Sequence, residues 1–93
     1  MEYFLTEKNN LCSENGNIAV DDLTKCKAAA EILGYPFRSP TNQFDRPKGC
    51  YESGGGFVYF NQHIRGSKRK NARQICEKGK GLRSFLTSMH LLA

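Results

Sequence analysis

The clearest periodic pattern lies between residues 21 and 34, where apolar residues recur every three or four positions. These positions are Leu23, Cys26, Ala30 and Leu33. Asp21 or Asp22 can cap the start of a helix there, because a carboxylate accepts hydrogen bonds from exposed backbone amides. Gly34 followed by Pro36 is a helix stop signal. The pattern therefore predicts one helix from about Asp22 to Leu33, with Cys26 on its buried face.

Three consecutive glycines, Gly54 to Gly56, separate two runs of strand-forming residues, GCYE and FVYF. A phosphate-binding loop of the P-loop type needs a Gly-Lys-Ser/Thr ending and a helix after it. Here the bulky segment from Phe57 to Phe60 follows, and aromatic or β-branched residues rarely begin a helix. We expect a β-hairpin with the glycines in its turn. The alternative is that the glycines let a ligand approach the backbone closely.

Shorter signals surround this hairpin. Tyr35 and Phe37 indicate a short edge strand, followed by a loop from Arg38 to Pro47. A second loop runs from Asn61 to Asn71, and the sequence ARQIC after it indicates a last strand that ends at Cys76. The segments YFL or NIAV, near the start of the chain, are expected beside that strand. The predicted fold class is α+β, a small antiparallel sheet with one helix packed across it.

Residues 81–93 carry a second amphipathic pattern. Its apolar face supplies the candidate partner-docking residues Leu82, Phe85, Leu86 and Met89. Such a face is normally covered, either by the domain's own sheet, by the groove of a partner or by a membrane surface. We expect one module over residues 1–80 and an amphipathic C-terminal helix over residues 81–93.

The chain is short, and its four cysteines change how its stability is interpreted. It has 93 residues, 39% of them hydrophobic, with no tryptophan and a mean hydropathy of -0.58. A domain of this size gains only a small margin of stability from burial. The cysteines, Cys12, Cys26, Cys50 and Cys76, are well separated. They lack the closely spaced pairs of a zinc site, so two disulfides are favoured over metal binding or free buried thiols.

Four cysteines allow three disulfide connectivities. The pair Cys26–Cys50 would attach the helix to the hairpin, and the pair Cys12–Cys76 would close the first strand region against the last. These two pairs are the favoured ones. Disulfides indicate the cell exterior or another oxidising lumen. The opening MEYFLTEKNN has neither the basic region nor the apolar core of a signal peptide. We therefore expect that a targeting segment is absent from this chain because it has been removed or because the chain is a fragment; the alternative is that the compartment is not an oxidising one. No apolar run reaches the roughly 18 residues of a membrane-spanning helix.

The cysteine framework carries a resemblance. The strings CKAAAExLG, PKGCY, VYFN and RQIC, together with Cys12, resemble a small four-cysteine module of secreted and surface proteins in algae, protists and marine animals. In outline the framework is also similar to the PAN/apple class, although modules of that class commonly carry further cysteines in the helix. The resemblance covers about two thirds of the chain, from Cys12 to Cys76. It implies a non-catalytic recognition or adhesion unit and names no ligand.

Basic residues concentrate in the last third of the chain. The segment from Arg65 to Arg83 holds eight basic residues and one acidic residue, whereas the remainder of the chain has a slight acidic excess. A basic loop beside aromatic residues can bind phosphate, sulfate or carboxylate groups. The candidate ligand-binding residues are Tyr59, His63, Arg65, Lys68, Arg69, Lys70 and Arg73. The expected ligand is an anionic glycan or an acidic protein surface; the alternative is a solvated loop that only keeps the module soluble.

The sequence contains no recognisable catalytic motif. Ser-His-Asp, HExxH and GxGxxG arrangements are all missing, and each cysteine has a simpler use in a disulfide. We therefore expect no enzyme activity, no cofactor and no metal. Nucleic acid is disfavoured because no nucleic-acid-binding motif matches. The leading hypothesis is a disulfide-stabilised recognition module, and the alternative is a structural accessory subunit docked through residues 81–93.

Overall fold

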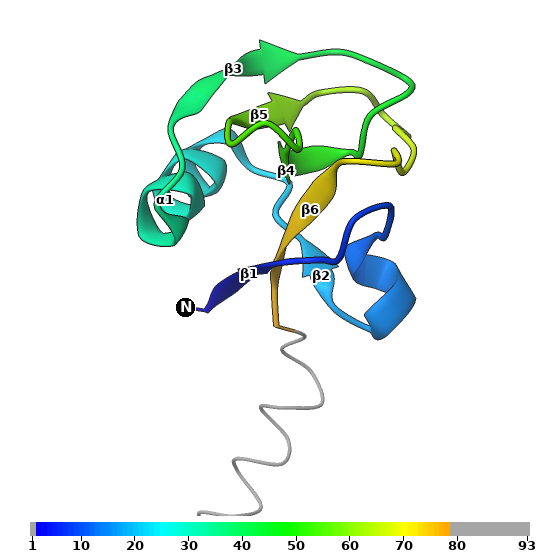
Figure 1. Cartoon of the computed structure of the whole chain (residues 1–93), viewed down its shortest axis with the longest axis horizontal. Helices are drawn as coiled ribbons and strands as arrows, with labels where there is room; N and C mark the ends of the chain where they lie inside the picture. The colour runs from blue at the N-terminus through cyan, green and yellow to red at the C-terminus, as the bar shows by residue number, and fades with distance from the viewer. Residues whose placement is uncertain (1, 79–93) are drawn as a thin grey trace, which may run out of the picture.

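The computed structural model describes residues 2–78, which form a six-stranded sheet with one α-helix and one turn of 3-10 helix (Figure 1). The strands are β1 (Tyr3–Leu5), β2 (Ile18–Ala19), β3 (Phe37–Thr41), β4 (Gly49–Glu52), β5 (Val58–Asn61) and β6 (Arg73–Glu77). The helices are η1 (Cys12–Asn15) and α1 (Leu23–Leu33). The expected C-terminal helix, with Leu82, Phe85, Leu86 and Met89, lies outside the described residues.

Helix α1 begins and ends where the sequence predicts. The Asp22 carboxylate accepts a hydrogen bond from the Lys25 backbone amide at 2.9 Å and caps the first turn. Gly34 ends the helix in the left-handed conformation, with φ of 84°. Cys26, Ala29 and Ala30 are buried, so the inward-facing position of Cys26 is confirmed.

The sheet is centred on β6, which pairs antiparallel with β1, β2 and β4. Both candidate segments near the start of the chain therefore lie beside the last strand. The expected hairpin is also present, because β4 pairs antiparallel with β5 across the glycine turn. Figure 1 shows α1 on one side of these strands and η1 near the opposite side of β6.

Strand β3 differs from the prediction in two ways. It occupies Phe37–Thr41, part of the segment that we expected to be a loop, and Tyr35 precedes it. It also runs parallel to β5, so the sheet is mixed and not wholly antiparallel. We expected a loop here because proline is common in loops and rare inside strands. At the edge of the sheet, where β3 pairs only with β5, the missing amide of Pro40 leaves the strand intact.

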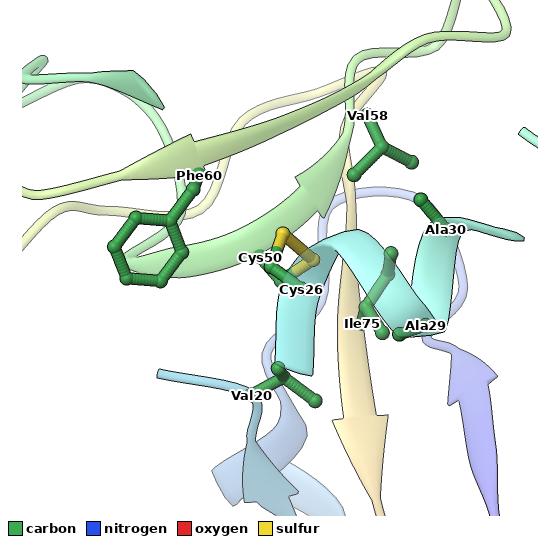
Figure 2. Packing of buried hydrophobic residues seen from close by; sticks show 8 residues of the cluster. All are labelled: Val20, Cys26, Ala29, Ala30, Cys50, Val58, Phe60 and Ile75. Atoms are coloured by element: carbon green, nitrogen blue, oxygen red, sulfur yellow. A yellow bond between two sulfur atoms is a disulfide. The ribbon is translucent and has the colours of Figure 1, made fainter. Parts of the chain in front are cut away.

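The hydrophobic core lies between α1 and the sheet and is built around a disulfide (Figure 2). The cluster contains Val20, Cys26, Ala29, Ala30, Cys50, Val58, Phe60 and Ile75. Cys26 of α1 is bonded to Cys50 of β4, and Cys12 of η1 is bonded to Cys76 of β6. The two favoured pairings are confirmed, and the described residues contain no free cysteine. Two disulfides are compatible with an oxidising environment.

These links should carry much of the stability of the fold. The loops that they close, of 24 and 64 residues, restrict the unfolded chain by roughly 3.5 and about 4 kcal/mol respectively. We expect Cys26→Ala/Cys50→Ala and Cys12→Ala/Cys76→Ala each to lower the free energy of unfolding by about 2 to 4 kcal/mol. Urea unfolding followed by circular dichroism measures both losses. Unchanged urea midpoints would show that the small apolar core is sufficient.

Candidate functional site

The glycine turn between β4 and β5 binds a carboxylate of the protein itself. The Glu52 side chain, 1% exposed, accepts hydrogen bonds from the backbone amides of Gly54 at 2.9 Å and Gly56 at 2.8 Å. Its other carboxylate oxygen accepts a hydrogen bond from Arg73 Nε at 3.0 Å. Two of the amides that an external phosphate would need are therefore occupied. This arrangement supports the interpretation of the glycines as turn residues.

Arg73, a candidate ligand-binding residue, serves this internal contact. Besides its bond to Glu52, its guanidinium donates to the Tyr35 hydroxyl at 3.2 Å. The hydrogen bond to the Glu52 carboxylate raises the pKa of Arg73 above its usual range. The structure thus gives Arg73 a structural use at the turn, apart from the other candidate basic residues.

Two loops at one end of the sheet meet and form a surface that we call the twin-loop end, residues 42–48 and 62–70. They follow β3 and β5, which run parallel, so both loops leave the sheet in the same direction (Figure 1). Buried Asn61, the last residue of β5, joins them through its carboxamide. Its Nδ2 lies 2.7, 3.1 and 3.0 Å from the carbonyl oxygens of Gln43, Arg46 and Pro47. Asn61 was not among the candidate residues.

Further contacts fix the second loop against the first. The Ser67 amide donates to the Arg46 carbonyl at 2.7 Å, and the Ser67 hydroxyl donates to the Phe44 carbonyl at 2.9 Å. Gly66 has a φ of 60°, and a Cβ at this position would lie 2.6 Å from the Arg46 carbonyl oxygen. Only glycine therefore fits here without moving the loops apart. These contacts fix the two loops of the twin-loop end against each other.

His63 has a structural contact in the same loop. Its Nδ1 accepts hydrogen bonds from the backbone amides of Arg65 at 3.1 Å and Gly66 at 2.8 Å. These bonds require Nδ1 to be unprotonated, and they hold the turn that presents Ile64 and Arg65. His63 therefore shapes the basic loop from within.

The twin-loop end carries the net charge of the whole chain. It contains six basic residues and one acidic residue, which gives a formal charge of +5, and the formal net charge of all 93 residues is also +5. The basic residues are Arg46, Lys48, Arg65, Lys68, Arg69 and Lys70, and the acidic one is Asp45. Pairing the loops thus adds Arg46 and Lys48 to the basic group that the linear sequence indicated.

Several of these cations have acidic neighbours. Arg46 and Arg69 both contact the Asp45 carboxylate, at 3.1 and 3.3 Å. Lys48 lies 3.4 Å from Asp21. Within residues 2–78, Arg65 and Lys70 have no ion pair. These two cations are therefore the most available to an external anion.

Lys68 extends the twin-loop end toward η1. Its Nζ lies 3.0 Å from Glu14 Oε1. This hydrogen bond, with a second one from the Leu11 backbone amide, lowers the pKa of the Glu14 carboxyl. Glu14 therefore stays ionised in mildly acidic solution, and the link between the basic loop and η1 persists there.

A groove of about 380 Å³ lies beside the basic loop. Arg65, Ser67 and Lys48 line it from the twin-loop end, and Gln74 of β6 lies along it. Its remaining wall comes from Leu11, Ser13, Ile18, Ala19 and Asp21. The groove thus combines Arg65, which has no ion pair among residues 2–78, with the Lys48–Asp21 ion pair and with apolar wall residues. A guanidinium in such a groove suits an anionic group of a ligand.

Tyr59 lies apart from this groove. Its ring stacks on that of Tyr51, its partner across β4 and β5, with ring centroids 5.7 Å apart. Both rings border a smaller pocket of about 230 Å³, which Arg46 also lines. Burial raises the pKa of the Tyr51 hydroxyl. Of the predicted ligand-binding residues, the structure therefore groups Arg65, Lys68, Arg69 and Lys70 on one loop and places Tyr59 at a separate pocket.

The chain was compared with protein-family models, with curated proteins and with solved structures, and none of them matches. The resemblance to a four-cysteine or PAN/apple-like module thus stays a prediction. Within residues 2–78, no group of three or more metal-ligating side chains lies together, and no helix is long and apolar enough to cross a membrane. The candidate site consists of the twin-loop end and the groove.

The internal carboxylate can be tested by replacing Glu52. Glu52→Gln removes the charge that pairs with Arg73, and we expect it to lower the free energy of unfolding by about 2 kcal/mol, because Arg73 loses its anion and the turn loses an acceptor. Chemical denaturation measures the loss. Glu31→Gln, at an exposed position of α1, is the matched control and should change stability by less than about 0.5 kcal/mol. Equal effects of both variants would contradict this structural use of Glu52.

The joint between the two loops can be tested at Asn61. Asn61→Asp replaces the donating amide group by an acceptor that faces three carbonyl oxygens, so we expect a loss of about 2 to 3 kcal/mol in unfolding free energy. Asn42→Asp, at an exposed position of the first loop, adds the same charge without replacing the Asn61 carboxamide. Thermal unfolding of both variants separates the hydrogen-bond effect from the charge. An unchanged melting temperature for Asn61→Asp would show that the loops are held by other contacts.

Proposed function

We propose that the chain is a non-catalytic, disulfide-stabilised recognition or adhesion module that binds an anionic ligand at the twin-loop end. One observation carries this proposal: the entire formal net charge of the chain, +5, equals that of residues 42–48 and 62–70. A concentration of positive charge on one surface both attracts and orients an anionic partner.

The groove is where this positive charge can contact a ligand. Arg65 reaches it without an ion pair among residues 2–78, and a guanidinium can form two parallel hydrogen bonds with a sulfate or carboxylate group. Ser67 and Gln74 also line the groove, but their side chains are hydrogen-bonded within the protein. Among the described residues, Arg65 is therefore the group at the groove that is available to an anion. An anionic glycan or an acidic segment of a protein surface supplies such an anion. The disulfides favour the cell exterior or another oxidising lumen as the place of binding.

The scaffold supports binding without chemistry. The four cysteines are oxidised in pairs, and His63 uses its Nδ1 to hold the basic loop. The rigid joint through Asn61 and Ser67 lowers the entropy that the loops lose when they bind.

A heparin column tests the proposal with a sulfated glycan. We expect Arg65→Glu to weaken heparin binding about tenfold, because it reverses an unpaired charge at the groove. Lys27→Glu, at an exposed position of α1, makes the same change in net charge and should reduce binding far less. The measurement is the salt concentration at elution, since salt screens such contacts. Equal shifts for both variants would reduce the interaction to net charge, and retention that salt does not affect would remove the anionic site altogether.

Gly66→Ala provides a second test that keeps every charge. Its Cβ would meet the Arg46 carbonyl oxygen and the Lys48 amide nitrogen, each at 2.6 Å, so the basic loop must shift away from its neighbour. We expect heparin to elute at lower salt from this variant, while urea unfolding shows that the disulfide-linked core persists. Elution at the wild-type position would show that the loop geometry does not matter for binding.

A further inference from the structure

Two large apolar side chains are exposed on the twin-loop end. Phe44 is 73% exposed in the first loop, and Ile64 is 81% exposed in the second. They are the two most exposed large hydrophobic residues among residues 2–78; the next is Ile32 of α1, at 65%. The proposed binding of an anion at the groove uses neither Phe44 nor Ile64.

The backbone at both positions is fixed. The Phe44 carbonyl accepts a hydrogen bond from the Ser67 hydroxyl at 2.9 Å, so the first loop is tied to the second at this residue. The turn after Ile64 is closed by His63, whose Nδ1 accepts from the two following amides. The structure therefore holds two apolar side chains outward on a joined support, which costs solvation free energy unless a partner covers them.

The charges beside these side chains select the partner. Asp45, the one acidic residue of the twin-loop end, is paired with Arg46 and Arg69. The surroundings of Phe44 and Ile64 are therefore cationic, with Arg65 and Lys70 lacking ion pairs among the described residues. A second copy of the chain does not fit, because it would bring two ends of the same +5 charge together.

A lipid surface fits better than a protein. Protein interfaces are depleted in lysine and aspartate, whereas the twin-loop end contains three lysines and, directly after Phe44, Asp45. The lysines are Lys48, Lys68 and Lys70. At a bilayer surface, apolar side chains enter the acyl boundary while neighbouring Lys and Arg pair with anionic headgroups. We infer that the twin-loop end inserts Phe44 and Ile64 into a lipid surface that carries anionic headgroups.

Fluorescence reports insertion directly, because the natural chain has no tryptophan. In the full chain, Phe44→Trp introduces a single indole at the proposed contact, and Ile32→Trp introduces one on α1 as the control. With phosphatidylcholine vesicles that contain phosphatidylserine, we expect a blue shift of emission for Phe44→Trp and none for Ile32→Trp. Phosphatidylcholine alone should produce little shift. Vesicle binding without a shift for Phe44→Trp would overturn the inference.

Co-sedimentation with the same vesicles measures affinity. We expect Phe44→Ser/Ile64→Ser to weaken binding at least tenfold, while Ile32→Ser changes it less than twofold. No sedimentation of the wild type, or unchanged sedimentation of the double variant, would overturn the inference, the latter by assigning lipid affinity to charge or to another segment.

Heparin retention separates this inference from the proposed function. The double variant keeps Arg65 and every other charge, so it should elute from heparin at the wild-type salt concentration. If heparin retention fell in parallel with vesicle binding, the apolar side chains would act by supporting the basic loop, and lipid insertion would be excluded. If wild-type retention on heparin failed while vesicle binding and its loss in the double variant held, the lipid contact would stand alone.

Discussion

Covalent sulfur links determine how this small domain is organised. Twelve apolar residues are buried among residues 2–78, and four of them are the cysteines of the two disulfides. With so few other large side chains, the position of α1 depends on Cys26–Cys50 and that of η1 on Cys12–Cys76. The first link lies within the apolar core (Figure 2), and the second ties the chain near its start to the central strand β6.

The core is small, and the two loops of the twin-loop end lie outside it as a surface for contact. The residues that hold the twin-loop end act through backbone hydrogen bonds: Asn61, Ser67 and His63 bind carbonyls and amides of both loops. The ion pair between Arg69 and Asp45, at 3.3 Å, also joins the two loops. The parallel pairing of β3 with β5 brings both loops to one end of the sheet.

Local signals in the sequence were sufficient for the helix and the hairpin, and the cysteine pairs were then ranked from the expected positions of these elements. Asp22 and Gly34 mark the bounds of α1 in any context, and the glycine turn fixes the hairpin because its neighbours favour strands. A short edge strand was predicted at Tyr35 and Phe37, and β3 is an edge strand that begins at Phe37. Its continuation through Pro40 and its parallel pairing could not be predicted in this way, since proline is tolerated only at a sheet edge and edge position is a property of the whole fold.

The candidate site was predicted less completely. The basic loop was visible as a run of charges, but the meeting of residues 42–48 with 62–70 depends on Asn61, whose contacts cross 14 to 18 positions of sequence. Arg73 looked like its basic neighbours and proved to be bonded to Glu52. The available sequence signal for Asn61 was a polar carboxamide side chain directly after the apolar run VYF.

The edges of the sheet have a consequence for how copies of this chain behave at high concentration. β1 spans three residues, and the outer edge of β3 carries Arg38 and the amide-free Pro40. Short edges with a charge or a proline offer poor templates for backbone pairing with another chain. Copies of the chain held close together on one surface should therefore not pair through their sheet edges, and they should resist fibril growth.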